Sequence, residues 1–133
     1  MRGVMRAPKR WARILAEWLD FAPDEEFPLT VHVSKGEYSG SFFADGDVFG
    51  IVIRCPHPRS PAKNDLRMVK YIFSHELRHY LDYVWARKAG LSPEEIDAFR
   101  GVLLSEAAAD AYAYLKSGVA GPHLRNRVTL GKR

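Results

Sequence analysis

Two histidines and a glutamate in the middle of the chain have the types and spacing of a metal site. His75, Glu76 and His79 lie in the run His-Glu-Leu-Arg-His. Residues four apart on a helix lie one above the other, so two imidazoles with this spacing can hold one zinc ion. Zinc makes a bound water acidic enough to act as a nucleophile, and Glu76 would accept its proton. Two surface histidines on an amphipathic helix are the alternative.

A catalytic zinc needs a third protein ligand and one open position. The segment Ser105–Asp110 offers Glu106, and Asp110 lies one helical turn further on and can face the same site. The three alanines between them leave room for a close approach to the histidine helix. A metal-bound histidine usually donates its other N–H to a carboxylate, which predicts a supporting role for Asp110.

The histidines require a long helix to position them. Asn64 or Asp65 can cap its start and Gly90 can close its end, so we predict a helix to about Ala89. Its apolar side chains cover a broad face, as expected for a helix at the centre of the fold: Leu66, Val69, Ile72, Phe73, Leu77, Leu81 and Val84.

A second helix should carry the third ligand. Ser92–Glu95 combines a cap residue, a proline at the first helical position and acids in the first turn. The pattern predicts a helix that runs to about Ser117 and stops at Gly118. Gly101 can soften this helix and divide it in two.

The remaining elements predict a small sheet and an N-terminal helix. Apolar residues at helical spacing predict a helix over residues 8–20. β-Branched runs predict strands over 29–33, 38–44 and 48–54, with a hairpin turn at 45–47 and one more strand over 127–130. The fold class expected is α+β, with a mixed sheet of three or four strands.

Length and composition are typical of a globular protein. A chain of 133 residues makes one domain, here 1–133. It has no apolar run long enough to span a bilayer and no signal-peptide core, so we expect a cytoplasmic protein without a membrane span. Its single cysteine, Cys55, excludes an intramolecular disulfide.

The positive charge is concentrated at the two ends of the chain. The formal net charge is +4, yet the basic termini, residues 1–10 and 121–133, hold no acid. The middle of the chain is therefore net negative. Basic termini can contact nucleic acid, but we favour the interpretation that they are solvated tails.

The pattern His75-Glu76-xx-His79 followed by Glu106-xxx-Asp110 resembles the gluzincin clan of zinc metallopeptidases, and the chain length is similar to its minimal, single-domain members. The resemblance implies a zincin-like fold with an active-site helix and a glutamate helix. It also implies zinc ligands at His75, His79 and Glu106, a general base at Glu76, and a partner for His75 at Asp110. The expected substrate is a polypeptide, hydrolysed at a peptide bond.

Two further features are implied by this resemblance. The strand before the active-site helix, 48–54, is expected to border the cleft and pair with substrate through Gly50, Ile51, Val52 and Ile53. An oxyanion donor is also required, and the candidates are Tyr80, Tyr83, Tyr112, His57 and His123. Minimal gluzincins include latent forms, so the basic termini are candidates to cover the cleft.

A second hypothesis keeps the zinc but not the proteolysis. The basic termini suggest a regulatory or DNA-associated module on a zincin scaffold, similar to SprT-like crosslink proteases. Those proteins usually take a third histidine as ligand, whereas Glu106 fits the position here, so we favour the peptidase.

Overall fold

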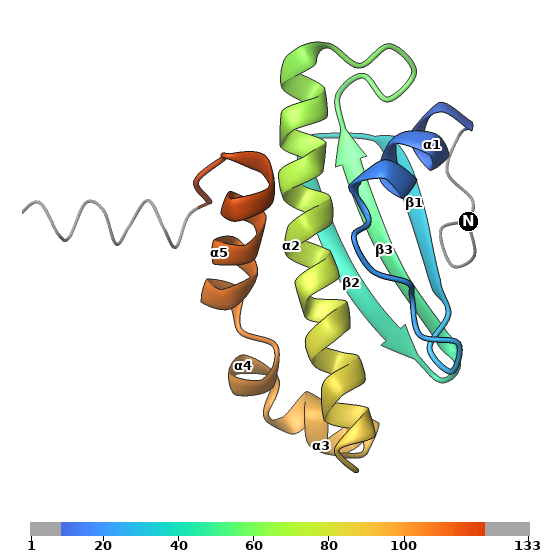
Figure 1. The fold of residues 1–133 in the computed structure, drawn as a ribbon, viewed down its shortest axis with the longest axis vertical. Helices are drawn as coiled ribbons and strands as arrows, with labels where there is room; N and C mark the ends of the chain where they lie inside the picture. Colours follow the sequence, from blue (N-terminus) through green and yellow to red (C-terminus); the bar gives the residue numbers. More distant parts are fainter. Residues whose placement is uncertain (1–8, 122–133) are drawn as a thin grey trace, which may run out of the picture.

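A computed structural model describes residues 9–121 of the chain, and its sheet has three strands (Figure 1). They are β1 (Leu29–Lys35), β2 (Ser39–Asp45) and β3 (Val48–Cys55), arranged in the order β1-β3-β2. β3 is parallel to β1 and antiparallel to β2. The prediction of a small mixed sheet in an α+β fold is therefore confirmed. The strand predicted over 127–130 lies outside the described residues.

The position of β3 overturns one prediction. We expected Gly50, Ile51, Val52 and Ile53 to border the cleft as a free edge, but β3 is the central strand. Its residues pair with β1 on one side and with β2 on the other. Backbone groups bonded to two neighbouring strands cannot also pair with a substrate. The edge strands are β1 and β2.

Two helices cover one face of the sheet. In Figure 1, α1 (Lys9–Trp18) and α2 (Lys63–Lys88) lie in front of the same face. Apolar residues alternate along β1 and β3, so one face of each strand is buried. The core between these layers includes Trp11, Leu15, Leu29, Val31, Ile51, Ile53, Val69, Phe73 and Leu77. Within residues 9–121, no helix is both long enough and apolar enough to cross a membrane.

The helix predicted from Ser92 to Ser117 is divided into three. They are α3 (Pro93–Ala98), α4 (Arg100–Leu103) and α5 (Glu106–Ser117). The breaks fall at Phe99 and at Leu104–Ser105, while Gly101 lies inside α4. Leu104 is buried, whereas Phe99 is exposed. Ser105 then starts a new helix, because its hydroxyl accepts a hydrogen bond from the Ala108 N–H. Gly118 ends α5, as predicted.

The start of α2 also differs from the prediction. Neither Asn64 nor Asp65 is the cap residue; Ala62 is. Asp65 lies three residues into the helix, where its carboxylate accepts the Ala62 N–H at 2.8 Å. The same carboxylate also accepts the hydroxyl of Tyr38, which lies just before β2. This buried aspartate therefore joins the start of the central helix to the edge of the sheet.

β2 approaches α2 closely because Gly40 has no side chain. A Cβ atom at this position would lie 2.3 Å from Ile72 Cγ2 and 3.3 Å from Glu76 Cγ. A separation of 2.3 Å essentially never occurs for a real Cβ atom, so a larger residue would force β2 or Ile72 to shift. The glycine therefore brings the sheet edge against the turn of α2 that carries Glu76.

Candidate metal centre

Three ligand atoms converge where α2 and α5 lie side by side (Figure 1). The rings of His75 and His79 point from successive turns of α2, with centroids 4.9 Å apart. Glu106, the first residue of α5, places one carboxylate oxygen 2.9 Å from His75 Nε2 and the other 3.0 Å from His79 Nε2. The ligand atoms of the three residues all lie within 4.8 Å of one another, so the group can hold a metal ion.

The contacts of His75 show why a cation fits between these residues. Its Nδ1 lies 2.8 Å from Asp110 Oδ1, and its Nε2 lies 2.9 Å from Glu106 Oε2. A neutral imidazole has only one N–H, so it can donate to one of these carboxylates but not to both. If the proton is on Nδ1, the lone pair of Nε2 faces the negative charge of Glu106. A metal ion bound to both groups removes this repulsion.

Asp110 is the carboxylate that orients His75, as its spacing suggested. It is fully buried on α5, and besides His75 it accepts the hydroxyl of Tyr71. Gly121 packs against this pair so closely that a Cβ atom there would lie 1.8 Å from the Tyr71 hydroxyl. By contrast, Nδ1 of His79 is buried without a hydrogen-bond partner in the described part of the chain. The two histidines are therefore supported unequally.

The three alanines before Asp110 do what their size predicts. Ala109 is fully buried, as is Ala113 one turn later. Methyl side chains let two helices pack closely. The break between α4 and α5 also helps to place the third ligand. The break at Leu104–Ser105 lets α5 begin at Glu106, so the third ligand lies at the N-terminus of a helix directed by its own cap.

Glu76 lies next to the ligands with its side chain turned toward the sheet. Burial raises the pKa of this carboxyl to about 7, while the charge of His75 and the backbone N–H of Phe42 oppose that rise. The hydrogen bond to Phe42 shows that Glu76 faces β2. A cavity of about 300 Å³ adjoins the ligands and is lined by Tyr38, Ser39, Gly40, Met68, Tyr71, Ile72, His75, Glu76, Glu106 and Asp110.

No family model, curated protein or solved structure matches the chain.

Two of the side chains proposed as oxyanion donors, Tyr80 and Tyr83, lie away from the metal cavity. The Tyr80 hydroxyl is buried, donates to the Phe27 carbonyl at 2.7 Å and accepts the Asp24 N–H. The Tyr83 ring packs in the core against Phe42 and Phe49. Neither residue lines the metal cavity.

The other three candidates are likewise not part of the described site. The Tyr112 hydroxyl donates to Asp20, which fastens α5 to the segment after α1. His57 lines a different hollow, beyond the end of β3. His123 lies outside the described residues.

The structure brings to the site three residues that the sequence pattern did not identify. Tyr71 and Tyr38 line the cavity, and the positive charge of Arg100 acts on both Glu76 and His79. Tyr71 had a usable signal, because it lies one helical turn before His75 on the same face. Tyr38 and Arg100 had none, since their positions depend on the path of the sheet and on the break after α3.

Proposed function

We propose that the protein is a zinc-dependent peptidase. The observation that supports this proposal best is the placement of Glu76. Three ligand atoms converge on one point, and a buried carboxylate from the same helical turn faces the adjoining cavity. A metal site that served only structure would have no use for a buried acid beside its ligands.

The donor set favours zinc. Two imidazoles and one carboxylate form a ligand set typical of catalytic zinc in hydrolases, with a fourth position left open. The Glu106 side chain is 57% exposed, so this position can communicate with solvent. A zinc ion held here would supply a Lewis acid that polarises the peptide carbonyl and acidifies a water molecule.

The remaining chemistry belongs to the side chains of this chain. Glu76 accepts a proton from the attacking water and returns it to the nitrogen of the departing amine. Its burial supports this role, because a carboxyl with a pKa near 7 can both accept and donate a proton at neutral pH. Asp110 accepts the Nδ1 proton of His75, which directs Nε2 of that ring toward the metal position.

The substrate proposed is an extended polypeptide, held along β2. This strand is an edge of the sheet, and its residues Ser39 and Gly40 line the metal cavity. An extended peptide can pair with a free strand edge through its backbone, which places one peptide bond beside Glu76. β2 thus takes the role that the sequence suggested for β3.

Metal content and peptide hydrolysis test the proposal together. The purified protein should bind one zinc ion and cleave unfolded casein. Glu76→Gln should keep the zinc but lose roughly 10²–10⁴-fold in rate. Glu106→Ala should lose the zinc. The exposed Glu94→Gln, on α3, is the matched control and should change neither property.

Two results would contradict the proposal. The ligand assignment is wrong if Glu106→Ala binds zinc as tightly as the wild type. A zinc-loaded wild type that cleaves no better than Glu76→Gln would show a metal site without peptidase activity.

A further inference from the structure

A second hollow lies beyond the carboxyl ends of β1 and β3, and it is separate from the metal cavity. β1 and β3 end together, with Lys35 paired to Cys55, and the chain leaves them in different directions. Residues 36–38 cross to β2, and residues 56–62 lead to α2. A cavity of about 580 Å³ opens there, lined by Val33, Ser34, Lys35, Pro56, His57, Pro58, Arg59 and Ser60. Ligands commonly bind beyond the carboxyl ends of parallel strands where their connections diverge.

The lining of this hollow is suited to an anion. Lys35, at the end of β1, and Arg59, in the loop after β3, bring positive charge to the lining, and His57 adds a ring N–H donor. The hydroxyls of Ser34 and Ser60 add further donors. No carboxylate is among the lining residues, and neither Lys35 nor Arg59 forms an ion pair within the described residues.

Asp65, the acid whose charge interacts with His57 of this loop, already accepts hydrogen bonds within the protein. Asp65 is buried, and its pKa is lowered by the hydrogen bond from the Tyr38 hydroxyl, by the Ala62 N–H and by the charge of His57. Its oxygens are therefore satisfied inside the protein and do not neutralise the exposed cations. The hollow keeps its positive character.

The loop that forms one wall is restrained by three prolines and by one hydrogen bond from α1. Pro56, Pro58 and Pro61 restrict its backbone. The buried Trp11 of α1 donates its indole N–H to the Pro58 carbonyl at 2.6 Å. A wall fixed in this way loses little conformational entropy when a ligand binds.

We propose that this hollow binds the phosphate group of a small phosphate monoester of nucleotide size. Arg59 and Lys35 neutralise the dianion, and Ser34, Ser60 and His57 donate hydrogen bonds to its oxygens. A volume of about 580 Å³ is in the range of small-ligand sites and exceeds what a phosphate alone requires. The inference does not depend on the proposed peptidase, since the two cavities share no lining residue.

Binding is tested by NMR on the zinc-loaded protein, with inorganic phosphate and adenosine monophosphate as separate probes. Both should shift the amide signals of Ser34 and Ser60, and the nucleotide should bind more tightly. Lys35→Gln/Arg59→Gln should weaken nucleotide binding at least tenfold. Glu106→Ala, which should lose the zinc, should leave nucleotide binding unchanged, and this result would separate the hollow from anion binding at the metal. Both lining cations are exposed, so the double variant should keep the wild-type fold and metal content.

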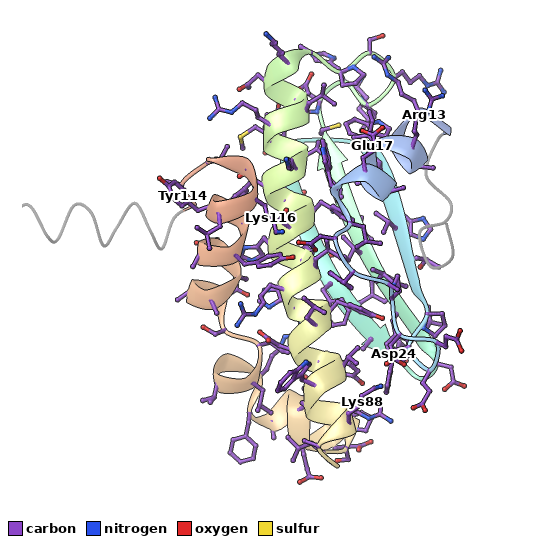
Figure 2. The ribbon with its side chains drawn as sticks, viewed as in Figure 1. Arg13, Glu17, Asp24, Lys88, Tyr114 and Lys116 are labelled. Carbon is purple, nitrogen blue, oxygen red and sulfur yellow. The ribbon has the colours of Figure 1, made fainter. Side chains whose placement is uncertain are left out.

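Arg13 provides the matched control. Figure 2 places its side chain on α1 at the same end of the molecule as the loop after β3, but it does not line the hollow. Arg13→Gln should change nucleotide affinity less than twofold if the hollow binds the phosphate. An equal loss in Arg13→Gln and in the double variant would overturn the proposal, because it would show diffuse charge attraction.

A twelve-residue oligothymidylate identifies the source of the phosphate. If it binds no more tightly than the mononucleotide, the ligand is a free monoester. If it binds much more tightly and loses that affinity in the double variant, the hollow accepts a nucleic-acid phosphate and the monoester assignment is overturned. The site is refuted altogether if neither phosphate nor nucleotide shifts the Ser34 and Ser60 signals, or if the double variant binds nucleotide as the wild type does.

Discussion

At the scale of single residues, the asymmetry between the two histidines has a measurable effect. His75 has a buried carboxylate behind its ring, whereas Nδ1 of His79 has no partner in the described structure. Orientation by a carboxylate commonly contributes 10–100-fold to metal affinity. His75 is therefore the histidine whose contribution to zinc affinity should depend on a neighbouring side chain, Asp110.

Asp110→Ala should consequently weaken zinc binding by roughly 10–100-fold while leaving the three ligands in place. Competition with a chromogenic chelator measures this affinity. Asp82→Ala is the control, because Asp82 is a carboxylate of α2 that pairs with Arg78 at 3.1 Å and does not line the metal cavity. Equal zinc affinity in Asp110→Ala and the wild type would show that the contact to His75 has no role in metal binding.

The residues of the candidate metal group were largely predictable because their spacing is local. His75 and His79 lie one turn apart, and so do Glu106 and Asp110, so helical geometry alone places each pair on one face. Tyr38 and Arg100 reach the site through long-range packing. The spacing of residues in the sequence does not indicate which segments pack beside the helix, so Tyr38 and Arg100 could not be predicted.

At the scale of elements, β2 approaches α2 closely at Gly40. Gly40→Ala would place a methyl group 2.3 Å from Ile72 Cγ2. We expect it to lower the free energy of unfolding by about 1–3 kcal/mol, as overpacking does. Urea unfolding measures the change.

A double variant and a matched glycine make this test specific. Ile72→Ala removes the Cγ2 methyl that the new side chain would meet, so the losses from Gly40→Ala and Ile72→Ala should sum to more than the loss in the double variant. Gly101→Ala is the control, because a Cβ atom there meets nothing within 4 Å. It should be neutral or slightly stabilising inside α4. Strict additivity at Gly40 and Ile72 would mean that the strand shifts away without strain.

The elements themselves were predictable where signals were local and unopposed. The strands and α1 appear close to where alternation and helical spacing predicted them, and Ser92 caps α3 as expected. The prediction of one continuous helix to Ser117 was wrong, because the burial of Leu104 and the new cap at Ser105 outweigh the helical hydrogen bonds lost at the break. The prediction that β3 is an edge strand was wrong. The order of strands in a sheet depends on the crossover connection, which the residue pattern within a strand does not reveal.

At the scale of the whole molecule, Asp65 connects the sheet to the central helix. Hydrogen bonds from Tyr38 and from the Ala62 N–H lower its pKa below the ordinary 3.8. A lowered pKa means that the folded state binds the proton less readily than the unfolded state. The stability from the ionised carboxylate is therefore complete above pH 3.8 and is lost as the pH falls through the lower, folded-state pKa.

Asp65→Asn should accordingly be less stable than the wild type at about pH 6, and the difference should shrink at about pH 3. Urea midpoints of both proteins across this range provide the measurement. Asp45→Asn, at the exposed end of β2, should differ little from the wild type across this range. A gap between wild type and Asp65→Asn that stays constant with pH would mean that the charge of Asp65 contributes nothing to stability.

The metal group also has a mechanical consequence for the assembly of the helices. At its far end, α5 is fastened by Lys116 and Tyr112 to Asp20, and Figure 2 shows Lys116 on the side of α5 that faces α2. Near its start, α5 pairs with the two histidines of α2 through Glu106 and Asp110. An ion bound there would join α2 to α5 and close the chain segment between them into a loop, as a covalent cross-link does. By the loop-entropy estimate used for cross-links, such a closure is equivalent to about 3 kcal/mol.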